Sequence, residues 1–167
     1  MPGRYRDPNF WVVVAMVLIA IGIIFFTYSE MYPVETPVGP LPFHHWMSIS
    51  GASIITVLIP AYILLKRYNQ HLRKSLFKIH IYGNLFAFLL ISIHFAHHTS
   101  EGIDPVIDTG TGFLQYGVVL LLITTGIIRR FQFASVYSQA WRFLHAGLTI
   151  SFYLIIINHI IRALRLG

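Results

Sequence analysis

The sequence predicts an all-α integral membrane protein, folded as a bundle of five transmembrane helices. Hydrophobic residues make up 56% of the 167 residues, and the mean hydropathy is +0.67. A soluble domain of this length cannot bury so much apolar surface. Five apolar stretches are each long enough to cross a hydrocarbon layer about 30 Å thick, and none carries Asp or Glu in its apolar core. We expect a single membrane domain over residues 1–167.

The predicted helices follow the apolar stretches in chain order. They cover residues 10–29, 44–65, 78–98, 112–129 and 141–161. The first stretch is too long for the core of a signal peptide and no small-residue cleavage site follows it, so we expect a retained helix. Pro60 is expected to kink the second helix. The third and fifth stretches carry histidines, and the fourth contains glycines that permit close packing or the approach of a cofactor: Gly112, Gly117 and Gly126.

The charged residues predict the orientation in the membrane. Three regions are rich in basic residues and are expected to face the cytoplasm: Arg4 and Arg6; Lys66, Arg67, Arg73, Lys74 and Lys78; and Arg129, Arg130 and Arg142. The other two loops contain acidic residues and no Lys or Arg: Glu30 and Glu35, then Glu101, Asp104 and Asp108. The N-terminus is therefore expected inside and the C-terminus outside. The net charge of +6 is explained by topology and by contact with lipid headgroups, so no nucleic-acid partner is expected.

Histidine is the expected metal ligand of this chain. The sequence contains no cysteine, which excludes disulfides, thiolate zinc sites, iron–sulfur clusters and thioether-attached haem. His80 and His94 lie fourteen residues apart in one apolar stretch, and His145 and His159 repeat that interval in another. Fourteen helical steps return the second side chain to within about 40° of the first, about 21 Å further along the axis. Each helix is expected to present two ligands on one face.

The predicted topology makes the third and fifth helices parallel, so their histidines match in depth. His80 and His145 are expected near the inner side, and His94 and His159 near the outer side. Two bis-histidine sites follow, and each suits a haem b held between facing helices. Small residues between the first two ligands, such as Gly83, are expected to let a porphyrin approach the backbone.

These residues resemble the transmembrane domain of the ferric reductase and NADPH oxidase family, in which the third and fifth helices each carry two haem-ligating histidines. The resemblance covers the third to fifth predicted helices, and WRFLH at 141–145 looks like the start of that family's fifth helix. It implies that the axial ligands of two haem b groups are His80, His94, His145 and His159. Many members continue into a flavin and nicotinamide domain. Only eight residues follow His159, so we expect any such domain on another chain. Cytochrome b of the respiratory bc complexes uses a similar histidine interval on a different helix set.

Together these features predict a dihaem cytochrome b subunit that carries electrons across a plasma or inner membrane. We expect it in a larger redox complex, where it exchanges electrons with quinol or with a soluble partner. Basic residues at the expected depth of the haem propionates are candidate partners of those groups: Lys78, Arg129, Arg130 and Arg142 inside, and Arg162 outside. Snorkelling at helix ends explains the same positions. Arg162 lies on the side that the charge bias disfavours, and pairing with a propionate would offset that cost.

A second group of histidines at the outer side leaves other interpretations open. It comprises HFAHH at 94–98 and HHW at 44–46. His98 is an alternative to His94 as a haem ligand. The HxxHH form also occurs in one histidine box of membrane di-iron desaturases and hydroxylases, which predicts an oxygenase instead. A third interpretation is copper or zinc binding, or proton transfer for a quinone or another acceptor, by four residues: His44, His45, His97 and His98. A non-redox helical membrane subunit whose histidines relay protons is a further alternative. Simple solvation at the membrane interface is the alternative to any ligand role.

Overall fold

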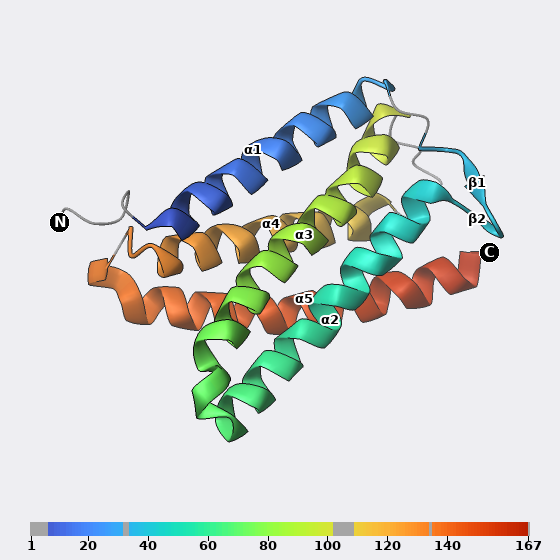
Figure 1. The fold of residues 1–167 in the computed structure, drawn as a ribbon. Coiled ribbons are helices and arrows are strands. Elements are labelled where there is room, and N and C mark those ends of the chain that lie inside the picture. The colour runs from blue at the N-terminus through green and yellow to red at the C-terminus, as the bar shows by residue number, and fades with distance from the viewer. Residues whose placement is uncertain (1–6, 32–33, 102–108, 134, 167) are drawn as a thin grey trace. The chain divides into compact units, whose positions relative to one another are not determined.

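The computed structural model describes residues 7–31, 34–101, 109–133 and 135–166. Five long helices run through these described residues, as predicted (Figure 1). They are α1 (Pro8–Tyr28), α2 (Phe43–Tyr68), α3 (Arg73–Ser100), α4 (Thr109–Arg130) and α5 (Ser138–Leu166). The short connecting elements are the strands β1 (Pro37–Val38) and β2 (Leu41–Pro42) and the 3-10 helices η2 (Gln70–Leu72) and η3 (Ser135–Tyr137). The all-α prediction is confirmed.

The chain forms two compact units, of which the first contains α1, α2 and α3 and the second contains α4 and α5. In the first unit α3 packs against both α1 and α2 (Figure 1). The approach of α2 to α3 is closest at Gly51, where a Cβ atom would lie 2.7 Å from the carbonyl oxygen of Ala87 and 2.8 Å from Cγ1 of Ile91. Only glycine permits this backbone approach, so Gly51 sets the register between the two helices.

The N-terminal end of α1 is tied to α3. Asp7 caps α1 by accepting a hydrogen bond from the backbone N–H of Asn9 at 2.9 Å, and Pro8 occupies the first helical turn. Tyr82 of α3 donates a hydrogen bond from its hydroxyl to Oδ1 of Asn9 at 2.8 Å. A polar contact between helices thus fixes the depth of α1 relative to α3.

A two-stranded hairpin between α1 and α2 holds the start of α2. The strands pair antiparallel, with Val38 opposite Leu41, and Gly39 makes the turn with a φ of +67°. The indole N–H of Trp46 donates to the carbonyl of Val38 at 2.8 Å. The backbone N–H of His44 donates to the carbonyl of Val34 at 3.2 Å. The first turn of α2 lacks a side-chain cap. The preceding loop therefore supplies acceptors for part of its free backbone N–H groups.

In the second unit α4 and α5 pack against each other as an antiparallel pair (Figure 1). Helix α4 ends where Gln132 adopts a φ of +53°, and the backbone N–H of Phe133 returns to the carbonyl of Ile128 at 3.1 Å. This is the left-handed termination that satisfies the last carbonyls of a helix. After η3 the chain continues as α5, which runs antiparallel to α4.

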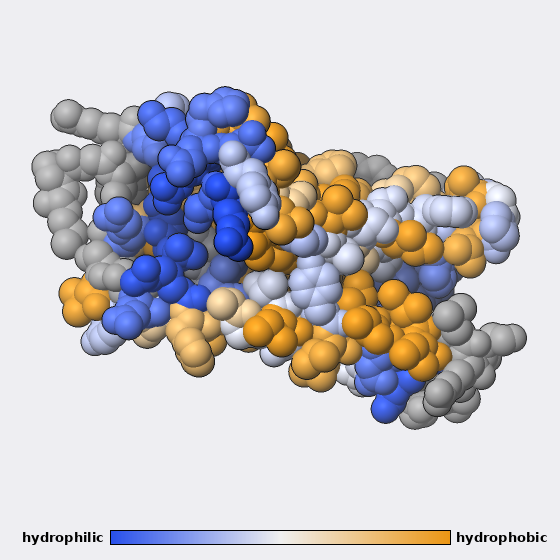
Figure 2. Space-filling model, turned by 90° about the horizontal axis from the view of Figure 1, so that it is seen from below, coloured by the Kyte–Doolittle hydropathy of each residue, from blue (hydrophilic) through white to orange (hydrophobic). Residues whose placement is uncertain are grey.

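The surface of the helices is that of a multi-pass membrane protein. Large apolar side chains are widely exposed; Leu18, Val57 and Leu154, for example, expose 63–65% of their surface. Five helices within the described residues are long and apolar enough to cross a membrane. Figure 2 views the side on which the turn between α2 and α3 lies. Hydrophilic residues gather around that turn, and hydrophobic residues cover much of the adjoining surface.

The helices begin before their predicted starts, and all but α1, which stops at Tyr28 where residue 29 was expected, extend beyond their predicted ends. The third prediction, 78–98, becomes Arg73–Ser100, and the fifth, 141–161, becomes Ser138–Leu166. The helices continue past the apolar stretches into segments that contain basic residues. A helix satisfies its own backbone hydrogen bonds at the watery membrane interface as well as in lipid. Several charges used to predict orientation lie outside the described residues: Arg4, Arg6, Asp104 and Asp108.

Candidate metal centres

The two predicted ligands of α3 both lie against α2. The ring of His80 stacks on Tyr62, with centroids 4.6 Å apart and an interplanar angle of 20°. The ring of His94 stacks on His44, with centroids 5.4 Å apart and an angle of 25°. Both side chains therefore share one face of α3, as the fourteen-residue interval predicts, and that face meets α2.

The small residues between these two histidines also face α2. A Cβ atom at Gly83 would collide with the side chain of Leu58, and a Cβ atom at Gly51 would collide with the carbonyl oxygen of Ala87. In the described structure α2 occupies the space beside these small residues, so the approach of a porphyrin at this face stays a prediction. Glycine here serves the packing of two helices.

His80 has a polar neighbour on its own helix. Nδ2 of Asn84 lies 2.6 Å from the carbonyl oxygen of His80 and 3.0 Å from Nδ1 of its ring. An amide nitrogen that donates to the carbonyl also presents a donor to the ring, so Nδ1 accepts and the proton resides on Nε2. In this conformation His80 offers no Nε2 lone pair to a metal.

The two predicted ligands of α5 have a different and repeated environment. Nδ1 of His145 lies 2.9 Å from Oγ1 of Thr125, and Nδ1 of His159 lies 3.1 Å from Oγ1 of Thr111. Both threonines belong to α4. Each histidine of α5 is thus held by one hydroxyl from the neighbouring helix.

The hydrogen bonds of Thr125 determine which nitrogen of His145 carries the proton. The hydroxyl of Thr125 donates to backbone carbonyls of its own helix, at 2.8 Å from Leu121 and 3.1 Å from Leu122. With its proton so directed, Oγ1 accepts from the ring, and Nδ1 of His145 is the donor. The lone pair then resides on Nε2, the state in which a histidine ligates a metal while its other nitrogen is held by an outer partner.

The environment of His145 recurs at His159 because α4 carries the same interval as α5. Thr111 and Thr125 are fourteen residues apart, and each is followed by a glycine. Those glycines face the rings: a Cβ at Gly126 would lie 3.5 Å from Cε1 of His145, and a Cβ at Gly112 would lie 3.8 Å from Cε1 of His159. Sequence reasoning noted the glycines and missed the threonines. The signal was the Thr-Gly pair repeated at the interval of the histidines.

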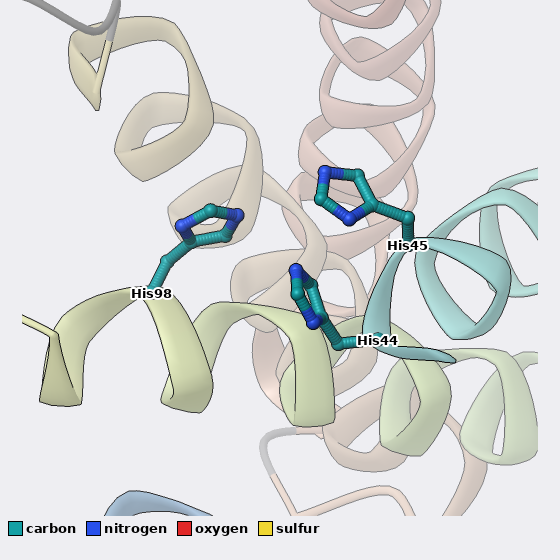
Figure 3. A group of neighbouring side chains, drawn as sticks. All are labelled: His44, His45 and His98. Atoms are coloured by element: carbon teal, nitrogen blue, oxygen red, sulfur yellow. The ribbon is translucent and has the colours of Figure 1, made fainter. Parts of the chain in front are cut away.

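Five histidines gather where α2 begins and α3 ends. The ring of His44 lies within 4.3 to 5.4 Å, centroid to centroid, of four others: His45, His94, His97 and His98. One ligand nitrogen from each of His44, His45 and His98 lies within 4.8 Å of the other two. Figure 3 shows these three rings, two from α2 and one from α3, turned towards a common space.

Simple solvation does not describe this outer group, because two of its members are buried. His44 exposes 4% of its surface and His97 exposes 5%. His97 lies beside acidic side chains, with Nε2 at 3.5 Å from Glu101 and 3.8 Å from Glu35. The carboxylates themselves are exposed. The alternative of interfacial solvation is wrong for His44 and His97.

Two of the basic residues predicted to pair with propionates, Arg142 and Arg162, lie near the ends of α5. Arg142 lies three residues before His145, and Arg162 lies three residues after His159. Both side chains are exposed. About one helical turn separates each arginine from its histidine, so the two side chains of each pair lie at the same end of α5.

The four predicted ligands are divided between the two units. His80 and His94 belong to the unit of α1 to α3, and His145 and His159 belong to the unit of α4 and α5. The pairing of His80 with His145 and of His94 with His159 stays a prediction from matched intervals.

No protein-family model, curated protein or solved structure matches this chain. The function therefore has to be argued from the chain's own residues.

Proposed function

We propose that this chain is a dihaem b-type cytochrome subunit that carries electrons across a membrane. The observation that supports the proposal best is the repeated contact between α4 and α5. Thr125 holds His145 and Thr111 holds His159, both through Nδ1. Two histidines oriented alike, about 21 Å apart along one helix, match the needs of two stacked haem groups. When bound, haem supplies the one-electron chemistry.

Four histidines are the proposed axial ligands. We assign His80 and His145 to the inner haem and His94 and His159 to the outer haem, because the two intervals of fourteen residues are equal. The chain's part is to fix the separation of the two sites, to exclude water with its apolar helices, and to orient the imidazoles.

The environments of the four ligands differ in how well they fit this role. His145 fits, because Thr125 leaves the lone pair on Nε2, and His159 has the same neighbours. His80 fits only after a change: its ring has to leave the stack on Tyr62, and Asn84 has to stop donating to Nδ1. The proposal therefore entails different surroundings for His80 in the haem-bound protein.

The remaining parts of the proposal rest on the charge pattern. The N-terminus lies inside and the C-terminus outside a plasma or inner membrane, because basic residues favour the cytoplasmic side. Arg142 and Arg162 would pair with the propionates of the inner and outer haem. The electron donor and acceptor are quinol, a soluble partner or other subunits of a membrane redox complex.

A pyridine haemochrome assay on the purified chain tests the proposal. We expect about two haem b per chain, and about one in each of the variants His145→Ala and His159→Ala. His71→Ala is the matched control, because His71 is exposed in η2 and is expected to leave the haem content unchanged. A protein without haem, or variants that retain both haem groups, would contradict the proposal.

A further inference from the structure

We propose that His44, His45 and His98 bind one transition-metal ion of the class that prefers imidazole, such as Zn²⁺ or Cu²⁺. The site lies at the outer ends of α2 and α3 and is built entirely within the first unit. It involves none of the four residues assigned to haem, and it stands or falls independently of that assignment.

The first step is geometric. One nitrogen from each of the three rings lies within 4.8 Å of the other two. Three nitrogens around a tetrahedral ion at about 2.0–2.1 Å are separated by about 3.4 Å, so modest rotations of the side chains close the site. The three rings already face one another (Figure 3). A three-histidine set leaves a fourth position open for water or another ligand.

The second step is the hydrogen bond of His44. Its Nδ1 lies 3.2 Å from the carbonyl oxygen of Val34. A carbonyl only accepts, so Nδ1 carries the proton and donates, and the lone pair resides on Nε2. A histidine that ligates a metal usually donates a hydrogen bond from its other ring N–H to an outer partner such as a backbone carbonyl. The loop before α2 thus prepares this buried ring for coordination.

The third step concerns His45. Its Nδ1 is buried and has no hydrogen-bond partner in the described structure. A buried nitrogen without a partner costs free energy, and a metal ion in the space between the rings would supply one. His45 therefore gives an observation independent of the spacing of the three nitrogens.

The fourth step is charge. Nδ1 of His98 lies 3.8 Å from Oε2 of Glu101, and the carboxylate favours a proton on Nδ1 and a lone pair on Nε2. Glu35 and Glu101 also place negative charge beside the group, close to His97. Three neutral imidazoles leave the charge of a divalent ion uncompensated, and the two carboxylates lower that cost.

Titration with Co²⁺ tests the inference. The full chain is purified through a tag without histidine, treated with a chelator, and titrated in detergent micelles. We expect one Co²⁺ per chain with the intense visible absorption of a tetrahedral site, and displacement of Co²⁺ by Zn²⁺. In His45→Asn and His98→Asn we expect the absorption to disappear and the affinity to fall more than about tenfold.

His71→Asn is the control variant, because His71 is exposed in η2, at the opposite ends of α2 and α3; its titration should match that of the unaltered protein. His98 is itself exposed, so its replacement should leave thermal unfolding unchanged and separate lost binding from lost folding. Absence of the tetrahedral absorption in the unaltered chain would overturn the inference. Tight 1:1 binding that survives in His98→Asn would overturn it too, and would point to His97 with its two carboxylates.

Discussion

Oγ1 of Thr125 in α4 lies 2.9 Å from Nδ1 of His145 in α5. The same threonine donates its own proton to the backbone of α4, so the contact leaves it one role, that of acceptor. A single hydroxyl thereby sets both the direction of the ring and the position of its proton. Thr111, fourteen residues earlier in α4, makes the corresponding contact with Nδ1 of His159 at 3.1 Å.

If the proposed haem binds at His145, Thr125→Val is expected to weaken its binding. Valine has nearly the shape of threonine but accepts no hydrogen bond, so His145 loses its outer partner. Loss of such a partner typically lowers metal affinity about 10–100-fold. Haem retention during titration with apomyoglobin as a competing acceptor measures the effect. Thr124→Val is the matched control, because the exposed Thr124 donates its hydroxyl to the carbonyl of Leu120 on its own helix at 2.8 Å. Equal haem loss in both variants would remove the assigned role of Thr125.

Gly51→Ala is expected to destabilise the first unit. The added methyl would lie 2.7 Å from the carbonyl of Ala87, so α2 and α3 have to move apart, and overpacking of this kind costs about 1–3 kcal/mol. Thermal unfolding in detergent, followed by circular dichroism, reports the change. Gly22→Ala in α1 is the control, because nothing lies within 4 Å of its added methyl and alanine favours a helix by about 0.5–1 kcal/mol. A Gly51 variant as stable as the Gly22 variant would show that the close approach is not required.

Cysteine labelling tests the proposed orientation. The chain has no cysteine, so a single introduced thiol is the only target for a membrane-impermeant maleimide. We expect Val38→Cys, in the exposed hairpin, to react from outside intact cells. Gln70→Cys, in the turn between α2 and α3, should react only after the membrane is permeabilised. The opposite pattern would reverse the orientation drawn from the positive charges.

Tyr82→Phe is expected to loosen the contact between α1 and α3. The substitution removes the hydroxyl that donates to Asn9 at 2.8 Å and keeps the ring. The free energy of unfolding should fall by about 0.5–1.5 kcal/mol. A double-mutant cycle with Asn9→Ala isolates the pair, and a coupling energy near zero would show that the two side chains act independently.

The five helices could be predicted from sequence because lipid imposes one requirement on every residue of a span. Apolar length alone locates such a helix, and no knowledge of its neighbours is needed. The residues at which the helices begin and end are harder to predict. Helix α3 begins at Arg73, five residues before the predicted start, because polar residues at the interface stay helical without any apolar signal. The hairpin at Pro37–Pro42 also lies outside the reach of hydropathy.

The candidate sites were only partly predictable. The interval from His80 to His94 places both on one face of α3, and the rings do share a face. Which neighbour that face meets depends on packing, and α3 has neighbours on two sides. Gly51 decides the matter by letting α2 approach, a fact that no spacing within α3 contains. The contact between His44 and Val34 was likewise invisible, because it depends on the path of a loop.

The five clustered histidines all come from residues 44 to 98, and this has a consequence for how the protein is made. Synthesis proceeds from the N-terminus at about 5–20 residues per second, so the 66 residues of the second unit take roughly 3–13 s longer to appear. During that time α2 and α3 can already lie side by side with every side chain of the group present. His145 and His159, which are translated later, then arrive at a membrane in which the clustered histidines can already be assembled.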